Sequence, residues 1–168
     1  GLAHARWLIT APTGEVFVAQ SYTGEVTQLI DKDGDGQADD IRTLATGFDA
    51  PHGLALHNGH LYIADRERVW RVPWKSGTPL LGKKEAVTPS GSLGGGGGHW
   101  TRTLAFAPDR RRFYVAIGSR SNIAEEDAPR ATIKQFNADG SNGQIYASGL
   151  RNPVGVAFHP DTGSLYTV

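Results

Sequence analysis

"LAFAPDRRRFYVA", residues 104–116, has the pattern of a β-strand, a polar turn and a second strand built on β-branched and aromatic residues. The same pattern recurs in "LITAPTGEVFVA" (8–19), "LALHNGHLYIA" (54–64) and "VAFHPDTGSLYTV" (156–168). The central aromatic residues of the four segments are separated by about 45 to 52 positions, a period typical of propeller blades; in chain order they are Phe17, Tyr62, Tyr114 and Tyr166.

Weaker strand patterns lie between these segments, in "EVTQLI", "IRTLATG", "RVWRVPW", "EAVTP", "TIKQFN" and "GQIYASG". The sequence therefore predicts an all-β fold, a β-propeller, with about three and a half four-stranded blades of a closed propeller that typically has about 4 to 8. The predicted blades cover about residues 5–47, 51–90, 100–149 and, for the start of a fourth, 153–168. A self-contained β-sandwich is the alternative, in which the repeat would be an accident.

Charge and composition exclude several classes of partner. Seventeen basic and seventeen acidic residues leave no net charge, which argues against nucleic acid as a partner. No apolar run approaches the roughly 18 residues of a membrane span, so membrane insertion is not expected. The chain has neither cysteine nor methionine, and we interpret it as a processed or excised piece. An open array of blades exposes a strand edge, which predicts self-association.

Three different residues occupy the same position of the repeat. Asp49, His99 and Arg151 each stand five residues before an inner strand, where the chain reaches one mouth of the central channel. We expect them to share this mouth with Trp100 and Asn152. An imidazole, a guanidinium, an amide and a carboxylate around one pocket suit acid–base chemistry on an anionic ligand.

Two other histidines, His57 and His159, follow corresponding strands of their units. Residues that recur in register usually serve the scaffold of a repeat protein. We therefore interpret both as structural.

The segment "DKDGDGQAD", residues 31–39, predicts a calcium-binding loop. Carboxylates at its positions 1, 3, 5 and 9, with a glycine at position 6, match the first part of an EF-hand loop. No helical pattern flanks the segment, so we expect a calcium-binding hairpin tip. The predicted ligands are Asp31, Asp33, Asp35, Asp39 and the carbonyl of Gln37. A solvated acidic turn without metal is the alternative.

Five glycines, residues 94–98, directly precede His99. The run matches G-x-G-x-x-G, but a strand follows where a dinucleotide-binding motif needs a helix. We interpret the run as a loop that lets main chain approach a flat cofactor or substrate. An ordinary flexible loop between two blades is the alternative.

At "GGHWTRTLAFAPDRRRFYVAIGSRSN" and "YASGLRNPVGVAFHP" the sequence resembles the L-sorbosone dehydrogenase branch of the soluble pyrroloquinoline quinone (PQQ) sugar dehydrogenases. The resemblance implies a six-bladed propeller with PQQ and calcium at the channel mouth. It implies that His99 acts as general base and that Arg151 and Asn152 lie beside PQQ. Trp100 at the mouth and Gly98 in the glycine run are also expected to contact the cofactor, from their places next to His99. Soluble glucose dehydrogenases have an aspartate where this chain has Ser119.

The predicted function is PQQ-dependent oxidation of a sugar or sugar aldehyde, with this chain as part of the enzyme. Two alternatives remain at this stage: a calcium-dependent propeller lactonase, and a non-catalytic, calcium-stabilised binding or assembly module. A calcium loop of this kind suits the periplasm or the exterior, where calcium is abundant.

Overall fold

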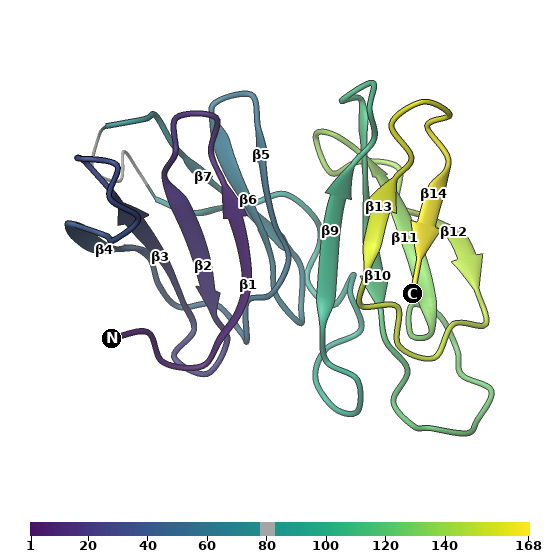
Figure 1. Cartoon of the computed structure of the whole chain (residues 1–168). Helices are drawn as coiled ribbons and strands as arrows, with labels where there is room; N and C mark the ends of the chain where they lie inside the picture. Colours follow the sequence, from purple (N-terminus) through teal and green to yellow (C-terminus); the bar gives the residue numbers. More distant parts are fainter. Residues whose placement is uncertain (78–82) are drawn as a thin grey trace.

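The computed structural model describes residues 1–77 and 83–168, and the regular structure within them is entirely β (Figure 1). The first sheet contains β1 (Ala5–Thr10), β2 (Val16–Gln20), β3 (Glu25–Ile30) and β4 (Asp40–Ala45). The second contains β5 (Leu54–His57), β6 (His60–Ala64), β7 (Val69–Pro73) and β8 (Glu85–Ala86). The third contains β9 (Arg102–Phe106), β10 (Arg112–Ile117), β11 (Thr132–Asn137) and β12 (Gln144–Ser148). A last hairpin pairs β13 (Val156–Phe158) with β14 (Leu165–Thr167). Within the described ranges, no helix has the length and apolar character needed to cross a membrane.

Each sheet is an antiparallel meander in which strands that follow one another in the chain are hydrogen-bonded neighbours. The first strands of successive sheets also lie side by side, β1 by β5, β5 by β9 and β9 by β13. Inner strands of a β-propeller are arranged in this way around the channel. The predicted all-β propeller fold is therefore confirmed, against the alternative of a β-sandwich.

The hydrophobic core lies between the sheets. One cluster joins the first two sheets, a second joins the second and third, and a smaller one joins the third sheet to the last hairpin. Phe113 and Phe136 are almost fully buried in the second cluster, with ring centroids 5.2 Å apart. Burial of one such side chain contributes about 2 to 3 kcal/mol to folding.

The antiparallel topology separates two ends of the array. One end, which we call the mouth end, is at the lower edge of Figure 1. It contains the segments before β5, β9 and β13, the turns 21–24 and 65–68 and the loop 118–131. The loop between β3 and β4 lies at the opposite end. The loop 118–131 is much longer than the corresponding turns of the first two sheets.

The fourth strand of the second sheet is shorter than the pattern "EAVTP" predicts. β8 ends at Ala86 because the next two main-chain N–H groups, of Val87 and Thr88, both donate to the carbonyl of Val69. The hydroxyl of Thr88 accepts the N–H of Val69 at 3.0 Å. The hydroxyl of Thr88 thus takes the place of a main-chain acceptor for the N–H of Val69 at this edge of the sheet.

Candidate active site

Two of the predicted site residues, His99 and Arg151, are joined through one atom of a third residue. Oδ1 of Asn122 accepts a hydrogen bond from Nη2 of Arg151 at 2.8 Å. The same oxygen lies 3.1 Å from Nε2 of His99. Asn122 belongs to the loop 118–131, whereas the other two residues precede the inner strands β9 and β13. The structure thus brings an imidazole and a guanidinium from neighbouring sheets within reach of one ligand.

The main chain of Ser119 ties the same three loops together. The N–H of His99 donates to the carbonyl of Ser119 at 2.9 Å, and the N–H of Ser119 donates to the carbonyl of Arg151 at 2.7 Å. The hydroxyl of Ser119 donates to the carbonyl of Ser121 at 2.6 Å. Asn122 is therefore the polar partner of the imidazole, whereas the side chain of Ser119 bonds its own loop.

Two buried guanidinium groups hold the glycine-rich segment. Arg102, the first residue of β9, is fully buried, and it donates to the carbonyls of Leu93, Gly95, His99 and Thr101 at 2.8 to 3.3 Å. Arg130 is 2% exposed and donates to the carbonyls of Gly95, Gly97, His99 and Ser119 at 2.7 to 3.3 Å. Because fixed donors satisfy the carbonyls of Gly95 and Gly97, the glycine run is a hydrogen-bonded loop.

The same two arginines place positive charge beneath the loop that carries His99. Burial, with the neighbouring charge of Arg130, lowers the pKa of Arg102 to about 9. Burial also lowers the pKa of Arg130. In the part of the chain that the structure describes, neither guanidinium forms an ion pair with a carboxylate. Both remain cationic at neutral pH, and their field favours an anion at the mouth end.

Close main-chain approaches explain two of the glycines around His99. A Cβ at Gly98, whose φ is +55°, would lie 2.2 Å from the carbonyl oxygen of Arg120. A Cβ at Gly118 would lie 2.5 Å from Cβ of His99 and 2.9 Å from Oδ1 of Asn152. The close approach of Arg120 and the positive φ already require glycine at position 98, and contact of Gly98 with a cofactor stays a prediction.

The other predicted mouth residues lie around a separate cavity. Trp100 and Asp49 line a space of about 560 Å³ at the mouth end, together with Arg6, Arg66, Tyr22 and Phe48. Asp49 forms an ion pair with Arg66, and the guanidinium of Arg6 lies 5.6 Å from the ring centroid of Trp100. Asn152 does not reach this cavity; its Oδ1 accepts from the hydroxyl of Thr101 at 3.3 Å.

A second cavity, of about 380 Å³, opens beside Asn122. It lies between the loop 118–131 and the segment before β13, and its lining includes Asn122, Glu126, Arg130 and Arg151. The carboxylate of Glu126 accepts the N–H groups of Arg120 and Ser121, and these hydrogen bonds lower its pKa. The carboxylate of Glu126 is therefore hydrogen-bonded within its own loop.

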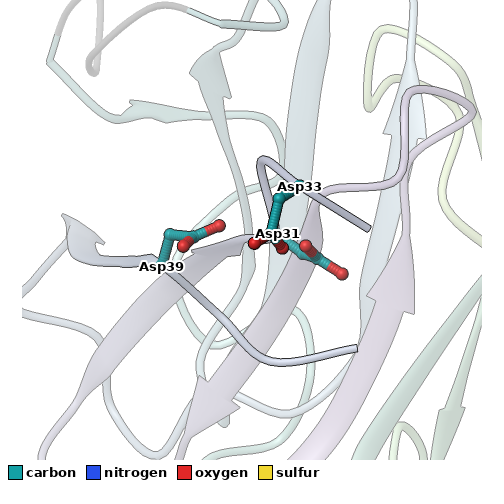
Figure 2. A group of neighbouring side chains, drawn as sticks. All are labelled: Asp31, Asp33 and Asp39. Atoms are coloured by element: carbon teal, nitrogen blue, oxygen red, sulfur yellow. The ribbon is translucent and has the colours of Figure 1, made fainter. Parts of the chain in front are cut away.

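The acidic loop gathers part of its predicted ligand set (Figure 2). Carboxylate oxygens of Asp31, Asp33 and Asp39 all lie within 4.8 Å of one another, and all three residues are exposed. The N–H groups of Gly36 and Gly34 donate to Asp31 and lower its pKa, so it stays an anion. Asp35 turns elsewhere: its carboxylate accepts the main-chain and side-chain N–H groups of Gln37. The structure therefore gathers three of the four predicted carboxylates, at the end of the array opposite His99.

Comparison with known proteins places this chain in a family. The family model described as TrAA12-like matches residues 1–168. The chain belongs to the TrAA12-like family. One relative, an uncharacterized protein of Borreliella burgdorferi, is 25% identical over 144 residues, which are 75% of this chain and 35% of that protein.

Solved structures show the same fold for this TrAA12-like chain. The PQQ domain of pyranose dehydrogenase from Coprinopsis cinerea, in its holo form, matches with a TM-score of 0.83 at 20% identity over 99% of this chain and 44% of that chain. A calcium structure of the family AA12 enzyme from Trichoderma reesei gives 0.81 at 23% identity, over 99% and 46% of the two chains. PQQ-bound aldose sugar dehydrogenase from Streptomyces coelicolor gives 0.68 at 19%, over 99% and 56%. The TrAA12-like chain thus spans about half the length of these solved chains.

Reasoning from the sequence missed three residues that hold or contact the loop of His99 in this TrAA12-like chain. Asn122 stands in the quoted motif "IGSRSN", but its contact with His99 depends on how the long loop folds back. Arg102 and Arg130 were not singled out, because a lone arginine near a strand is usually a surface residue. The sequence held one signal for Arg102. This residue begins an inner strand and stands close in sequence to His99 and the glycines. His57 and His159 lie in the scaffold; His57 stacks on Phe106 with ring centroids 4.2 Å apart, and Nδ1 of His159 accepts main-chain N–H groups of its own turn.

Proposed function

We propose that this chain carries the catalytic base and part of the cofactor site of a PQQ-dependent sugar or sugar-aldehyde dehydrogenase. The observation that carries the proposal is the convergence of His99 and Arg151 on one oxygen of Asn122 at the mouth end. The names of the solved neighbours, a pyranose dehydrogenase PQQ domain and a PQQ-bound aldose sugar dehydrogenase, support it. The substrate class we propose is an aldose or a sugar aldehyde of the sorbosone type.

The residues present fit a flat, anionic quinone. PQQ carries carboxylates, and the two cavities at the mouth end are lined by four guanidinium groups, those of Arg6, Arg66, Arg130 and Arg151. Two of the carboxylates that line these cavities already have partners. Asp49 forms an ion pair with Arg66, and Glu126 accepts main-chain N–H groups. Arg151 is exposed, so its remaining donors are available to a carboxylate or a quinone oxygen.

Each side chain then has a role that its chemistry suits. His99 takes the proton of the sugar hydroxyl, because imidazole is the side chain that titrates near neutral pH. Arg151 places a fixed positive charge where negative charge grows during the reaction. Bound PQQ would supply the acceptor for the hydride of the substrate carbon. Trp100 and the Asp49–Arg66 pair give the larger cavity an aromatic face and polar groups that suit a sugar ring.

The acidic loop is proposed as a structural calcium site, with Asp31, Asp33 and Asp39 as its carboxylate ligands. It joins β3 to β4 far from His99, so calcium there would stabilise the first sheet without taking part in chemistry. The exterior or the periplasm is the compartment that we propose on this basis.

Binding of PQQ tests the proposal directly. We would titrate the chain with PQQ in the presence of calcium and follow absorbance and calorimetry, with Arg151→Ala as the test variant. Arg111→Ala is the matched control, since Arg111 lies in the turn between β9 and β10 at the opposite end. We expect saturable binding, weakened at least about tenfold in Arg151→Ala, as expected for loss of one charge-assisted contact, and unchanged in the control. A folded chain that does not bind PQQ would show that these sheets alone do not form the site.

The two alternative functions make different demands. A propeller lactonase needs carboxylates and amides that converge on a metal ion at the channel, but Asp49 is paired with Arg66 and Asn152 accepts from Thr101. If the chain is a binding or assembly module, His99→Ala should not change its activity. Oxidation of an aldose by the PQQ-loaded protein that is lost in His99→Ala would therefore separate the dehydrogenase from both.

A further inference from the structure

One oxygen atom of Asn122 contacts both Arg151 and the imidazole of His99. This atom, Oδ1, lies 2.8 Å from Nη2 of Arg151 and 3.1 Å from Nε2 of His99. A guanidinium only donates hydrogen bonds, so the amide atom that faces Arg151 must be the oxygen and not the NH₂ group. The orientation of the Asn122 amide is therefore set by Arg151.

That orientation fixes the proton on the imidazole. An amide oxygen only accepts hydrogen bonds, so Nε2 of His99 must be the donor. A neutral imidazole carries one ring proton, and with that proton on Nε2 the lone pair lies on Nδ1. The contact with Asn122 thus selects one of the two tautomers of His99.

The surrounding loop holds Asn122 in place. The residues before it are anchored by the main chain of Ser119, which accepts from His99 and donates to Arg151. The next turn is closed by Glu126, which accepts the N–H groups of Arg120 and Ser121. The exposed side chain of Asn122 is therefore carried on a segment tied to both of its partners.

We propose that Asn122 is a positioning residue that keeps His99 in the Nε2–H tautomer and makes Nδ1 the proton acceptor. The role in catalysis rests on the proposed function of His99 as general base. In that step the O–H bond of the sugar hydroxyl breaks, its proton moves to Nδ1, and the Nε2–H bond to Asn122 stays intact. The imidazolium that forms then donates to a neutral amide, and Arg151 keeps its own hydrogen bond to the same oxygen.

The tautomer can be measured on the chain as it is, without cofactor. We would record the ¹⁵N shifts of the histidine ring nitrogens above pH 7.5 and assign His99 by the signals lost in His99→Gln. The test variants are Asn122→Ala, which removes the acceptor, and Asn122→Asp, which keeps an oxygen at that place. Ile123→Ala is the matched control, because Ile123 is the next residue of the loop and its side chain is 95% exposed.

We expect a protonated Nε2 and an unprotonated Nδ1 in the unaltered chain, in Asn122→Asp and in Ile123→Ala. In Asn122→Ala the two shifts should move toward each other as the tautomers interconvert. The Nε2 proton should then exchange with water about tenfold faster, the factor expected for loss of one hydrogen bond. A protonated Nδ1 in the unaltered chain, or the same spectrum in Asn122→Ala, would overturn the proposal.

This outcome is independent of PQQ binding. If the tautomer is as expected and PQQ does not bind, the proposed function fails while the role of Asn122 in orienting His99 stands. If PQQ binds and His99 shows the other tautomer, the proposed function stands and the role of Asn122 is wrong.

Discussion

Gly118 lies so close to His99 that a Cβ at position 118 would stand 2.5 Å from the Cβ of the histidine. Both residues belong to the mouth end: Gly118 comes directly after β10, and His99 precedes β9. The N–H of His99 donates to the carbonyl of Ser119, the residue after Gly118. The absence of a side chain at this position allows the imidazole to lie over the end of the third sheet.

Gly118→Ala should therefore displace His99. The new methyl group meets a Cβ atom and a carbonyl oxygen that cannot move freely, and overpacking of this kind costs about 1 to 3 kcal/mol. We expect a lower free energy of unfolding in urea and loss of the His99 ring signals at their native positions. Gly96→Ala is the control, because a Cβ there meets only the guanidinium of Arg66, and an unaltered His99 spectrum in Gly118→Ala would contradict this account.

Arg102→Met should destabilise the mouth end more than any surface change. The substitution keeps much of the buried volume but leaves the carbonyl of Leu93 without its donor and removes one of the two guanidinium donors of the Gly95 carbonyl. A buried acceptor without a partner costs about 1 to 3 kcal/mol, so we expect a loss of that order or more in urea unfolding. Arg111→Met, at an exposed position, should change the free energy by less than about 0.5 kcal/mol. Equal effects of the two variants would show that Arg102 does not hold the loop.

Stability should fall as the pH drops from about 6.5 toward 4. His52 is 2% exposed between Trp7 and Trp100, and burial lowers its pKa to about 4. The unfolded chain takes up this proton near pH 6.5, so the full stability is present above that value and is lost progressively below it. The lowered pKa of His57 acts in the same direction.

The size of this loss is on the order of 3 kcal/mol for His52, from a shift of about two and a half units. Urea unfolding at several pH values measures it, and His52→Gln should flatten the curve between pH 6.5 and 4. His4→Gln, at an exposed position, serves as control and should leave the slope in place. An unchanged slope in His52→Gln would assign the pH dependence to other groups.

Calcium binding should depend on Asp33 more than on Asp35. Asp33→Asn removes a charge from the three gathered carboxylates, whereas Asp35 already bonds the N–H groups of Gln37. We expect calorimetric titration with calcium to show at least about tenfold weaker binding in Asp33→Asn, because ligand charge sets affinity in such loops. An equally large effect of Asp35→Asn would favour the larger ligand set predicted from the sequence.

The chain should self-associate through its last hairpin. Within the described residues β13 and β14 pair only with each other, and Tyr166 and Val168 are 60% and 92% exposed. An exposed strand edge with apolar side chains can pair with a strand of another chain. Light scattering at tens of micromolar should give a mass above that of one chain, reduced by Tyr166→Lys; a monomeric mass at that concentration would rule this out.

The sequence predicted the propeller, and the structure confirmed it against a β-sandwich. A strand–turn–strand segment repeated at a period near fifty can be satisfied only by sheets that stack, because each sheet needs a neighbour to bury residues such as Phe17 and Phe113. The register of that repeat also placed Asp49, His99 and Arg151 at one end, since residues before an inner strand share that end in every sheet. The acidic loop could be recognised because its ligands are close in sequence.

The tertiary structure decided which of these residues touch. Asn122 reaches His99 and Arg151 because a long loop folds back over two sheets, and no periodicity encodes that path. The roles of Arg102 and Arg130 follow from burial, which depends on packing and not on local propensity. Which of the four carboxylates gather also depends on the folded loop, in which Asp35 bonds Gln37 while Asp31, Asp33 and Asp39 lie together. Periodic patterns specify repeated structure, whereas a site on a symmetric scaffold depends on the irregular loops that break the repeat.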